Sequence, residues 1–205
     1  RIMIITFNFA RGITDYKFLI RDTSDENHST SSATINDWLS FCREVTTKWR
    51  EDYQRGRKIG GEGIVVEIDE SKIGKRKYNR GRWIEGKWIL GMMEIQTGNV
   101  KRGGELRLEI CPENKRNAET LLPILLNHIE VGTIICSDLW AGYRRLTALG
   151  YEHFTVNHSV EFVNSATEAN TQTIECLWSK LKRFLGSGTK EELLQSHLDE
   201  FLWRR

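Results

Sequence analysis

Short apolar runs and helical patterns follow one another from Gly63 to the end of the chain, and their order predicts the fold class. Three strand-like runs come first, and helical and strand-like segments then alternate. The strand-like runs are IVVEIDE, KWILGMMEIQ, ELRLEIC, TIICSD and HFTVNH, and the helical patterns are NAETLLPILLNHIE, AGYRRLTALG, IECLWSKLKRFL and TKEELLQSHLDEFLW, the last with Thr189 as a candidate N-cap. This order predicts an α/β protein, with helices packed on the faces of a mixed sheet.

Residues 2–57 show only helical patterns, and the glycine-rich RKIGGEG separates them from the strand-like runs. Two short helices are predicted at IMIITFNFA and DYKFLIRDT. A longer helix is predicted at SATINDWLSFCREVTTKW, with Ser32 as its N-cap. Three helices with a polar connector fit a helix-turn-helix, although most three-helix segments bind no DNA. We therefore predict a helical, helix-turn-helix-like segment over residues 1–57 and a second domain over residues 58–205.

The composition limits the classes of ligand and compartment. The formal net charge is +2 over 205 residues, so any affinity for nucleic acid must come from local basic patches. No apolar run approaches the roughly 18 residues that a membrane-spanning helix needs. The four cysteines form no CxxC pair, which argues against a zinc site or a disulfide framework and indicates a reducing compartment. Neither GxxxxGK[ST] nor GxGxxG occurs, so nothing indicates nucleotide-phosphate binding.

Two of the strand-like runs end in an aspartate. IVVEIDE ends near Asp69, and TIICSD ends at Asp138. A strand that delivers a carboxylate at its tip holds it on a rigid element beside a cleft, as a functional site requires. Aspartate is also common at strand ends as a turn residue or helix cap, and this alternative stays open for each residue taken alone.

A third acid, Glu175, lies in the helical pattern NTQTIECLWSKLKRFL next to its apolar stripe. Lys182 follows seven positions later, two helical turns further on the same side. A helical glutamate taken alone is more often a solvated surface residue. Two acids at strand ends and one on a late helix are nevertheless the set that a two-metal phosphoryl-transfer site requires, because carboxylate oxygens hold Mg²⁺ or Mn²⁺.

Four ordered motifs carry a resemblance to a known family. EIDESKIGKRKYNRGRW, ICSDLWAGYRRL, GYEHFTVNHSVEFV and NTQTIECLWSKLKRFL resemble segments of the Merlin-type DDE transposases and their bacterial insertion-sequence relatives. The closing FLWRR is similar to the end of that family, and SSATINDWLSFCREV resembles the recognition-helix region of its DNA-binding segment. The resemblance spans almost the whole chain and implies an RNase H-like fold for the catalytic domain.

The resemblance also implies roles for single residues. Asp69, Asp138 and Glu175 take the places of the three catalytic acids that hold two Mg²⁺ or Mn²⁺ ions, and Lys182 matches a lysine used near the DNA backbone. His158 matches the family's "NHs" motif and ranks below the acids. Where the family has a histidine before "TqtIE", this chain has Asn170, which cannot act as a general base near neutral pH. Any proton-handling role for that position is therefore in doubt.

Asp69 is followed directly by a second acid, Glu70. Adjacent strand residues point to opposite faces of a sheet, so both cannot face one metal pair. The resemblance selects Asp69, and we expect Glu70 to be a neighbouring salt-bridge or surface residue. Glu67 shares the face of Asp69 and is a lesser candidate.

Basic residues follow the first acid and surround the third. Taken alone they are compatible with a solvated turn, but beside metal-binding acids they favour contacts with DNA phosphates, with Tyr78 and Trp83 available for stacking on bases. We expect Trp178 to be a core residue. The candidate DNA-binding residues are Lys72, Lys75, Arg76, Lys77, Arg80, Arg82, Lys180 and Arg183.

These observations predict a transposase that cuts and joins DNA by metal-assisted phosphoryl transfer. The resemblance implies terminal inverted repeats and target DNA as ligands, a dimer or higher assembly on DNA, and a location in the nucleus of a eukaryote or the nucleoid of a bacterium. Two alternatives stay open. One is a host-adopted transposase derivative that binds DNA without cutting it, and the other is an RNase H-like nuclease with another nucleic-acid substrate.

Overall fold

The computed structural model describes residues 1–74, 85–95, 104–156, 171–186 and 189–205, which fall into two compact units. The first unit combines Arg1–Arg55 with Ser196–Arg205, and the second runs from Gly56 to Gln195. The break after Arg55 lies just before RKIGGEG, and the return of Ser196–Arg205 to the first unit is not evident from the sequence. Within these ranges, no helix has both the length and the hydropathy that crossing a bilayer requires.

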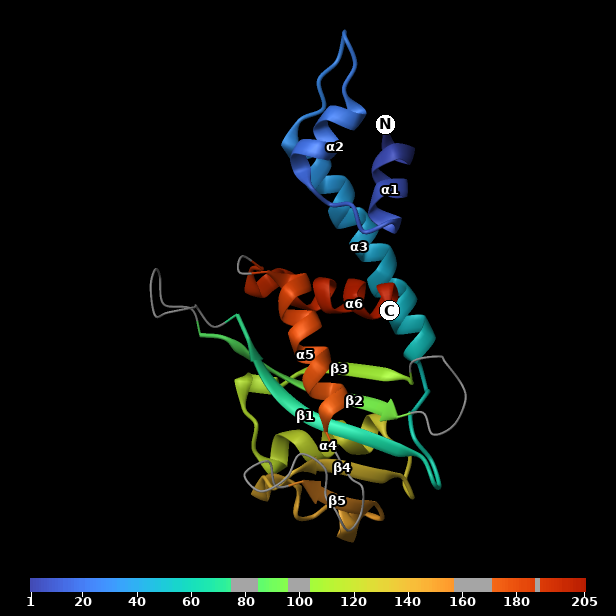
Figure 1. The fold of residues 1–205 in the computed structure, drawn as a ribbon, viewed down its shortest axis with the longest axis vertical. Helices are drawn as coiled ribbons and strands as arrows, with labels where there is room; N and C mark the ends of the chain where they lie inside the picture. The colour runs from blue at the N-terminus through green and yellow to red at the C-terminus, as the bar shows by residue number, and fades with distance from the viewer. Residues whose placement is uncertain (75–84, 96–103, 157–170, 187–188) are drawn as a thin grey trace. The chain divides into compact units, whose positions relative to one another are not determined.

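The first unit is helical, with α1 (Ile2–Ala10), α2 (Tyr16–Thr23), α3 (Ser32–Gln54) and α6 (Leu194–Arg204) (Figure 1). The Asp15 carboxylate caps α2 by accepting a hydrogen bond from the Phe18 amide. The Ser31 hydroxyl caps α3 by accepting one from the Thr34 amide, so the predicted N-cap at Ser32 is wrong by one residue. The apolar faces of these helices form a core at Ile5, Phe9, Leu19, Ile35, Leu39 and Cys42.

The second unit is built on a five-stranded mixed sheet, which confirms the predicted α/β class. The strands are β1 (Val65–Ile73), β2 (Lys87–Ile95), β3 (Leu106–Ile110), β4 (Ile134–Asp138) and β5 (Glu152–Val156), in the spatial order β3-β2-β1-β4-β5. The first three strands form an antiparallel meander, and β4 and β5 extend it on the other side of β1 in parallel pairing. Parallel pairing needs a crossover, and α4 (Ala118–His128) lies between β3 and β4 in the chain.

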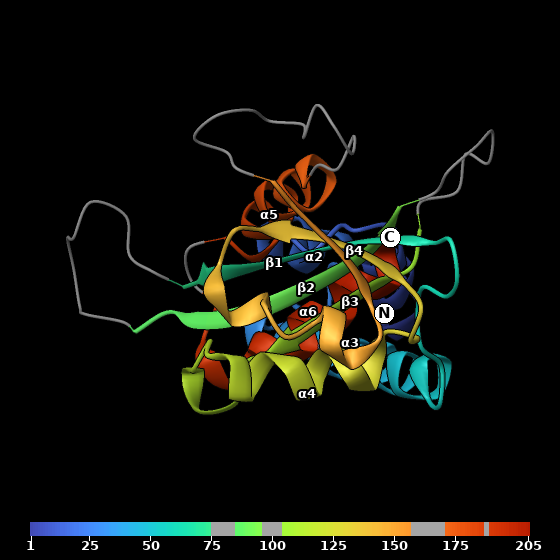
Figure 2. The same ribbon diagram turned by 90° about the horizontal axis from the view of Figure 1, so that it is seen from below.

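Helices cover both faces of this sheet. Figure 2 shows α4 against one face and α5 (Gln172–Leu185) against the other. The α4 side holds the larger core, which includes Ile68, Met92, Leu121, Leu125 and Ile135. On the other side, the stripe Ile174, Leu177, Trp178, Leu181 and Leu185 of α5 is buried, as its helical spacing predicts. The two strands that carry acids therefore lie at the centre of the sheet, between two layers of helix.

Two further local predictions are wrong. The segment AGYRRLTALG forms two short 3₁₀ turns, Ala141–Tyr143 and Thr147–Leu149, instead of one helix. The hydroxyl of Thr189 donates to the carbonyl oxygen of Leu185, so it does not cap the following turn, whose N-cap is Lys190.

Candidate active site

Asp69 and Asp138 lie on neighbouring strands and on the same face of the sheet. The parallel ladder between β1 and β4 pairs Val65 with Ile134 and Glu67 with Cys136. Continuing this register by two residues brings Asp69 level with Asp138, and the period of two places both side chains on the face that α5 covers. Burial raises the pKa of Asp69, and the negative charges of Asp138 and Glu175 raise it further. The structure therefore places Asp69 and Asp138 side by side, and the charge of Glu175 also acts on Asp69.

The position of Asp69 within its strand differs from the expectation. β1 continues to Ile73 in antiparallel pairing with β2, so Asp69 lies in the middle of the strand and pairs with Gly91. It is near an end only on the β4 side, where the last pair is Glu67 with Cys136. Asp138 is the last residue of β4, as predicted, and its Oδ1 accepts a hydrogen bond from the Trp140 amide at 3.0 Å. Asp138 thus stabilises the following turn and also lies on the same face of the sheet as Asp69.

Trp178 supplies a hydrogen bond to Asp69. Its indole Nε1–H donates to Asp69 Oδ2 at 2.8 Å, and its ring is buried, as expected for a core residue. The ring lies over Gly91, where an added Cβ would come within 2.8 Å of Trp178 Cζ2. This contact with Asp69 was not apparent from the apolar stripe, because helical spacing identifies a buried ring but not the partner of its N–H.

Glu67 faces the same way as Asp69 but is fully buried beneath the start of α5. Its Oε2 accepts a hydrogen bond from the Ile174 amide at 2.8 Å. Ile174 is in the first turn of α5, where amides lack partners within the helix, and the preceding Thr171 makes no side-chain cap. Burial raises the pKa of Glu67, and the charge of Glu175 adds to this effect. We interpret Glu67 as a cap for α5 supplied by the sheet.

Glu175 lies on the exposed side of the first turn of α5, and its Oε1 accepts a hydrogen bond from the Thr171 hydroxyl at 3.0 Å. Lys182 is in the last turn of the same helix, roughly 10 Å further along its axis at 1.5 Å per residue. Lys180 and Arg183 are also exposed on α5. The helix therefore presents one acid at its start and several basic residues towards its end.

Glu70 faces the opposite side of the sheet, as the alternation of strand residues predicts. It is partly buried, and its Oε1 accepts a hydrogen bond from the Tyr143 hydroxyl at 2.6 Å, so it is neither the exposed nor the salt-bridged residue that we expected. Burial raises the pKa of Glu70 to about 7, and the charges of Asp69 and Asp138 contribute to the shift.

The basic residues around the first acid divide into two groups. Lys72 shares the face of Glu70, and its Nζ lies 5.7 Å from the ring centre of Trp88, which Arg116 also contacts at 4.4 Å. Lys72 is therefore on the face opposite Asp69. Several predicted residues lie outside the described ranges, namely Lys75, Arg76, Lys77, Tyr78, Arg80, Arg82, Trp83, His158 and Asn170.

The donor set fits a divalent cation in its chemistry. In the described part of the chain, neither Asp69 nor Asp138 forms an ion pair, so two like charges lie close together without a neighbouring cation to offset them. Mg²⁺ and Mn²⁺ prefer such oxygen donors. Across the same residues, no three acidic, histidine or cysteine side chains are arranged as a metal site. The two aspartates are thus the part of the predicted site that this structure brings together.

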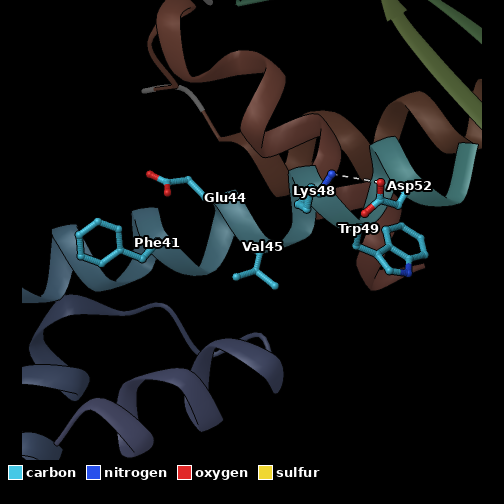
Figure 3. Close-up of a pocket in the computed structure, with 6 residues that line it drawn as sticks. All are labelled: Phe41, Glu44, Val45, Lys48, Trp49 and Asp52. Carbon is cyan, nitrogen blue, oxygen red and sulfur yellow. Dashed lines mark hydrogen bonds and ion pairs between the residues drawn. The ribbon is translucent and has the colours of Figure 1, made fainter. Parts of the chain in front are cut away.

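A second surface feature lies on α3 of the first unit. Phe41, Val45 and Trp49 form an exposed apolar stripe at a spacing of four residues (Figure 3). Glu44, Lys48 and Asp52 flank it, and Lys48 pairs with Asp52 at 3.1 Å. Acidic side chains repel DNA phosphates, so this half of α3 is a poor candidate for contact with the DNA backbone.

The mixed five-stranded sheet with helices on both faces is the architecture of an RNase H-like domain, and a helical segment precedes it. Comparison with known proteins agrees, because residues 58–205 match the ISXO2-like transposase domain. Over 87 residues the chain is 31% identical to an uncharacterized transposase-like protein of Haemophilus influenzae, an alignment that covers 42% of this chain and 69% of that protein. The chain therefore belongs to the ISXO2-like transposase family. The predicted RNase H-like fold and the membership of a transposase family are confirmed.

Proposed function

We propose that this chain is a DNA transposase of the Merlin type, which cuts and joins DNA at transposon ends by phosphoryl transfer. The observation that carries the proposal is the pair Asp69 and Asp138, level with each other on one face of the central strands and without an ion pair in the described part of the chain. Glu175 contributes the third carboxylate from the start of α5. The family of the chain supports DNA as the substrate.

Asp69, Asp138 and Glu175 are the residues that would hold a pair of Mg²⁺ or Mn²⁺ ions. Bound there, the ions would supply activation of the attacking oxygen and stabilisation of the leaving one. The reaction has two balanced steps. Water first breaks the P–O3′ bond at the element's end and leaves a 3′-hydroxyl and a 5′-phosphate. That hydroxyl then attacks a phosphodiester of the target, forms a new P–O bond and releases a target 3′-hydroxyl.

The protein's own part in this chemistry is positioning and charge. Lys180, Lys182 and Arg183 are exposed on the helix that carries Glu175, where they can neutralise phosphates of the bound strand. Lys72 lies on the other face of β1 and would contact DNA only where it passes around the sheet edge. We assign recognition of the terminal inverted repeats to the helical segment, residues 1–57, and pairing of two ends to a dimer or higher assembly.

Single substitutions test the three acids. Asp69→Asn, Asp138→Asn and Glu175→Gln should each lower Mn²⁺-dependent cleavage by roughly 1000-fold, because each removes a charged oxygen ligand while keeping its shape. Cleavage is measured on labelled duplexes that carry the inverted repeats flanking the protein's gene, and DNA binding is measured on the same duplexes. Glu70→Gln is the matched control, since it changes the neighbouring carboxylate on the opposite face and should leave cleavage intact.

Two outcomes would contradict the proposal. Retained cleavage in any one of the three variants would remove that residue from the site. If the wild-type protein binds the repeat duplexes but nicks them with neither Mg²⁺ nor Mn²⁺, the chain is a DNA-binding derivative of a transposase and not an active one.

A further inference from the structure

α5 donates hydrogen bonds to β1 from positions on both sides of Glu175. The Ile174 amide donates to Glu67, and the Trp178 indole donates to Asp69. The two donors are one helical turn apart, and the two acceptors are alternate residues of one strand, so both bonds lie on the same face of the sheet. The first acid and the helix that carries the third acid are therefore linked directly.

Gly91 makes the second of these bonds geometrically possible. It pairs with Asp69 across the β1–β2 ladder. A Cβ at Gly91 would lie 2.8 Å from Trp178 Cζ2, 2.9 Å from Cη2 and 3.0 Å from Ile174 Cδ1, distances at which the ring or the strand must move. The absent side chain leaves the space that the indole occupies beside Asp69.

The donor to Asp69 is neutral, and this distinguishes it from an arginine or lysine. A cationic donor would hold the carboxylate in place but would also offset its charge, and so weaken its attraction for a metal ion. An indole N–H orients the carboxylate and leaves the negative charge in place. Second-layer hydrogen bonds of this kind set the orientation and affinity of metal ligands in proteins.

We propose that Trp178, seated over Gly91, is a positioning residue that orients the Asp69 carboxylate for divalent metal. This inference rests on the proposed function, in which Asp69 is a metal ligand. On this inference Trp178 is more than a core residue. Gly91 is required because it has no side chain to displace the indole ring.

Replacement of the indole N–H tests the role. Incorporation of β-(3-benzothienyl)alanine at position 178 keeps the bicyclic shape but replaces N–H with sulfur, and Trp178→Phe is a second variant that also removes the donor. Both should weaken Mn²⁺ binding to the DNA-free protein by roughly 10-fold to 100-fold, the range for loss of such a hydrogen bond. Binding is measured by calorimetry or by the electron paramagnetic resonance signal of free Mn²⁺.

The Mn²⁺ dependence of the cleavage rate provides a second readout. A purely structural role of Trp178 would not change this dependence in the same way. At limiting Mn²⁺ the variants should cleave more slowly than wild type, and saturating Mn²⁺ should restore much of the rate. Gly91→Ala should reproduce this pattern, because it displaces the ring without removing the N–H. Trp203→Phe, a substitution of the same kind in the first unit, is the matched control and should leave Mn²⁺ affinity unchanged.

The outcomes separate this inference from the proposed function. If wild type binds Mn²⁺, Asp69→Asn abolishes that binding and the Trp178 variants bind like wild type, then Asp69 is a ligand but Trp178 does not position it, and the inference is overturned. If wild type does not bind Mn²⁺, or Asp69→Asn leaves binding unchanged, then the proposed metal site itself has failed.

Discussion

The two units of this protein surround their buried carboxylates with different partners. In the first unit, Asp199 of α6 lies 2.8 Å from the guanidinium of Arg50, and Glu200 accepts a hydrogen bond from Arg204. In the second unit, Glu67, Asp69 and Glu70 accept hydrogen bonds from an amide, an indole and a phenol. In the described chain none of these three forms an ion pair, so no salt bridge offsets the charge of Asp69.

This difference separates a structural use of buried acids from a functional one. An arginine beside a buried carboxylate offsets its charge, and the pair then serves to join two helices, here α3 and α6. Neutral donors fix a carboxylate without offsetting its charge, which leaves it able to bind a cation. Groups whose pKa is shifted by burial together with like charges are enriched at functional sites, and Asp69 is of this kind.

The largest effect should come from breaking an ion pair of the first unit. Asp199→Asn removes the negative charge that faces Arg50 and leaves a largely buried guanidinium unpaired. We expect the free energy of unfolding to fall by about 3 to 5 kcal/mol, the usual effect of removing one partner of a buried pair. Urea denaturation monitored by circular dichroism measures this change.

Asp52→Asn provides the control for that experiment, because Asp52 is half-exposed and pairs with Lys48 at the surface. It should change stability by no more than about 0.5 kcal/mol. Equal effects of the two substitutions would show that the pair around Asp199 has no special role in the first unit.

A second prediction concerns the pH dependence that Glu70 confers. Its pKa is raised from 4.5 to about 7 in the folded protein, so the folded chain holds a proton there that the unfolded chain has lost. Stability should therefore fall as the pH rises between these values, by up to about 3 kcal/mol from this residue. Thermal denaturation in chelator at pH 4.5, 6 and 8 tests this for wild type and Glu70→Gln.

The Gln variant keeps an acceptor for the Tyr143 hydroxyl but has no proton to lose, so its stability should vary less with pH. Glu67 and Asp69 also have raised pKa values, so the stability of the variant should still fall with rising pH, but less steeply than that of wild type. Parallel pH profiles for the two proteins would show that Glu70 is not protonated preferentially in the folded state.

The sequence predicts the sheet better than the segments between its strands. Apolar runs of strand length and a well-formed helical stripe on α5 identify their elements because each buries a face of regular period. The segment AGYRRLTALG fails as a helix for a local reason. Gly142 packs against the Trp140 ring, and the buried Tyr143 and Leu146 are three residues apart, a spacing that suits 3₁₀ turns.

The candidate site is predictable only in part, because some of its residues lie in local motifs and others depend on how distant segments pack. Asp69 and Asp138 are recognisable because each lies in a local motif. The hydrogen bonds of Glu67 and Trp178 depend on how β1, β2 and α5 pack, and the partner of Gly91 depends on strand register. Neither the packing of these elements nor the strand register can be derived from residues that are adjacent in the chain. For the same reason, the return of α6 to the first unit has no signal in the local pattern.

The smallest predicted change in the free energy of unfolding is that of Asp69→Asn, which contrasts most sharply with Asp199→Asn. Asp69→Asn makes the same chemical change at a carboxylate held by neutral donors, and Asn Oδ1 can still accept the hydrogen bond from Trp178. Because the substitution also removes a charge that burial disfavours, the free energy of unfolding in chelator should stay equal or rise by up to about 1 kcal/mol. Mn²⁺ should raise the melting temperature of wild type and not of the variant, because a ligand stabilises only the state that binds it.

A loss of more than about 2 kcal/mol in chelator would place Asp69 with the structural acids of the first unit. An equal response of both proteins to Mn²⁺ would mean that the uncompensated charge of Asp69 does not serve to bind the metal.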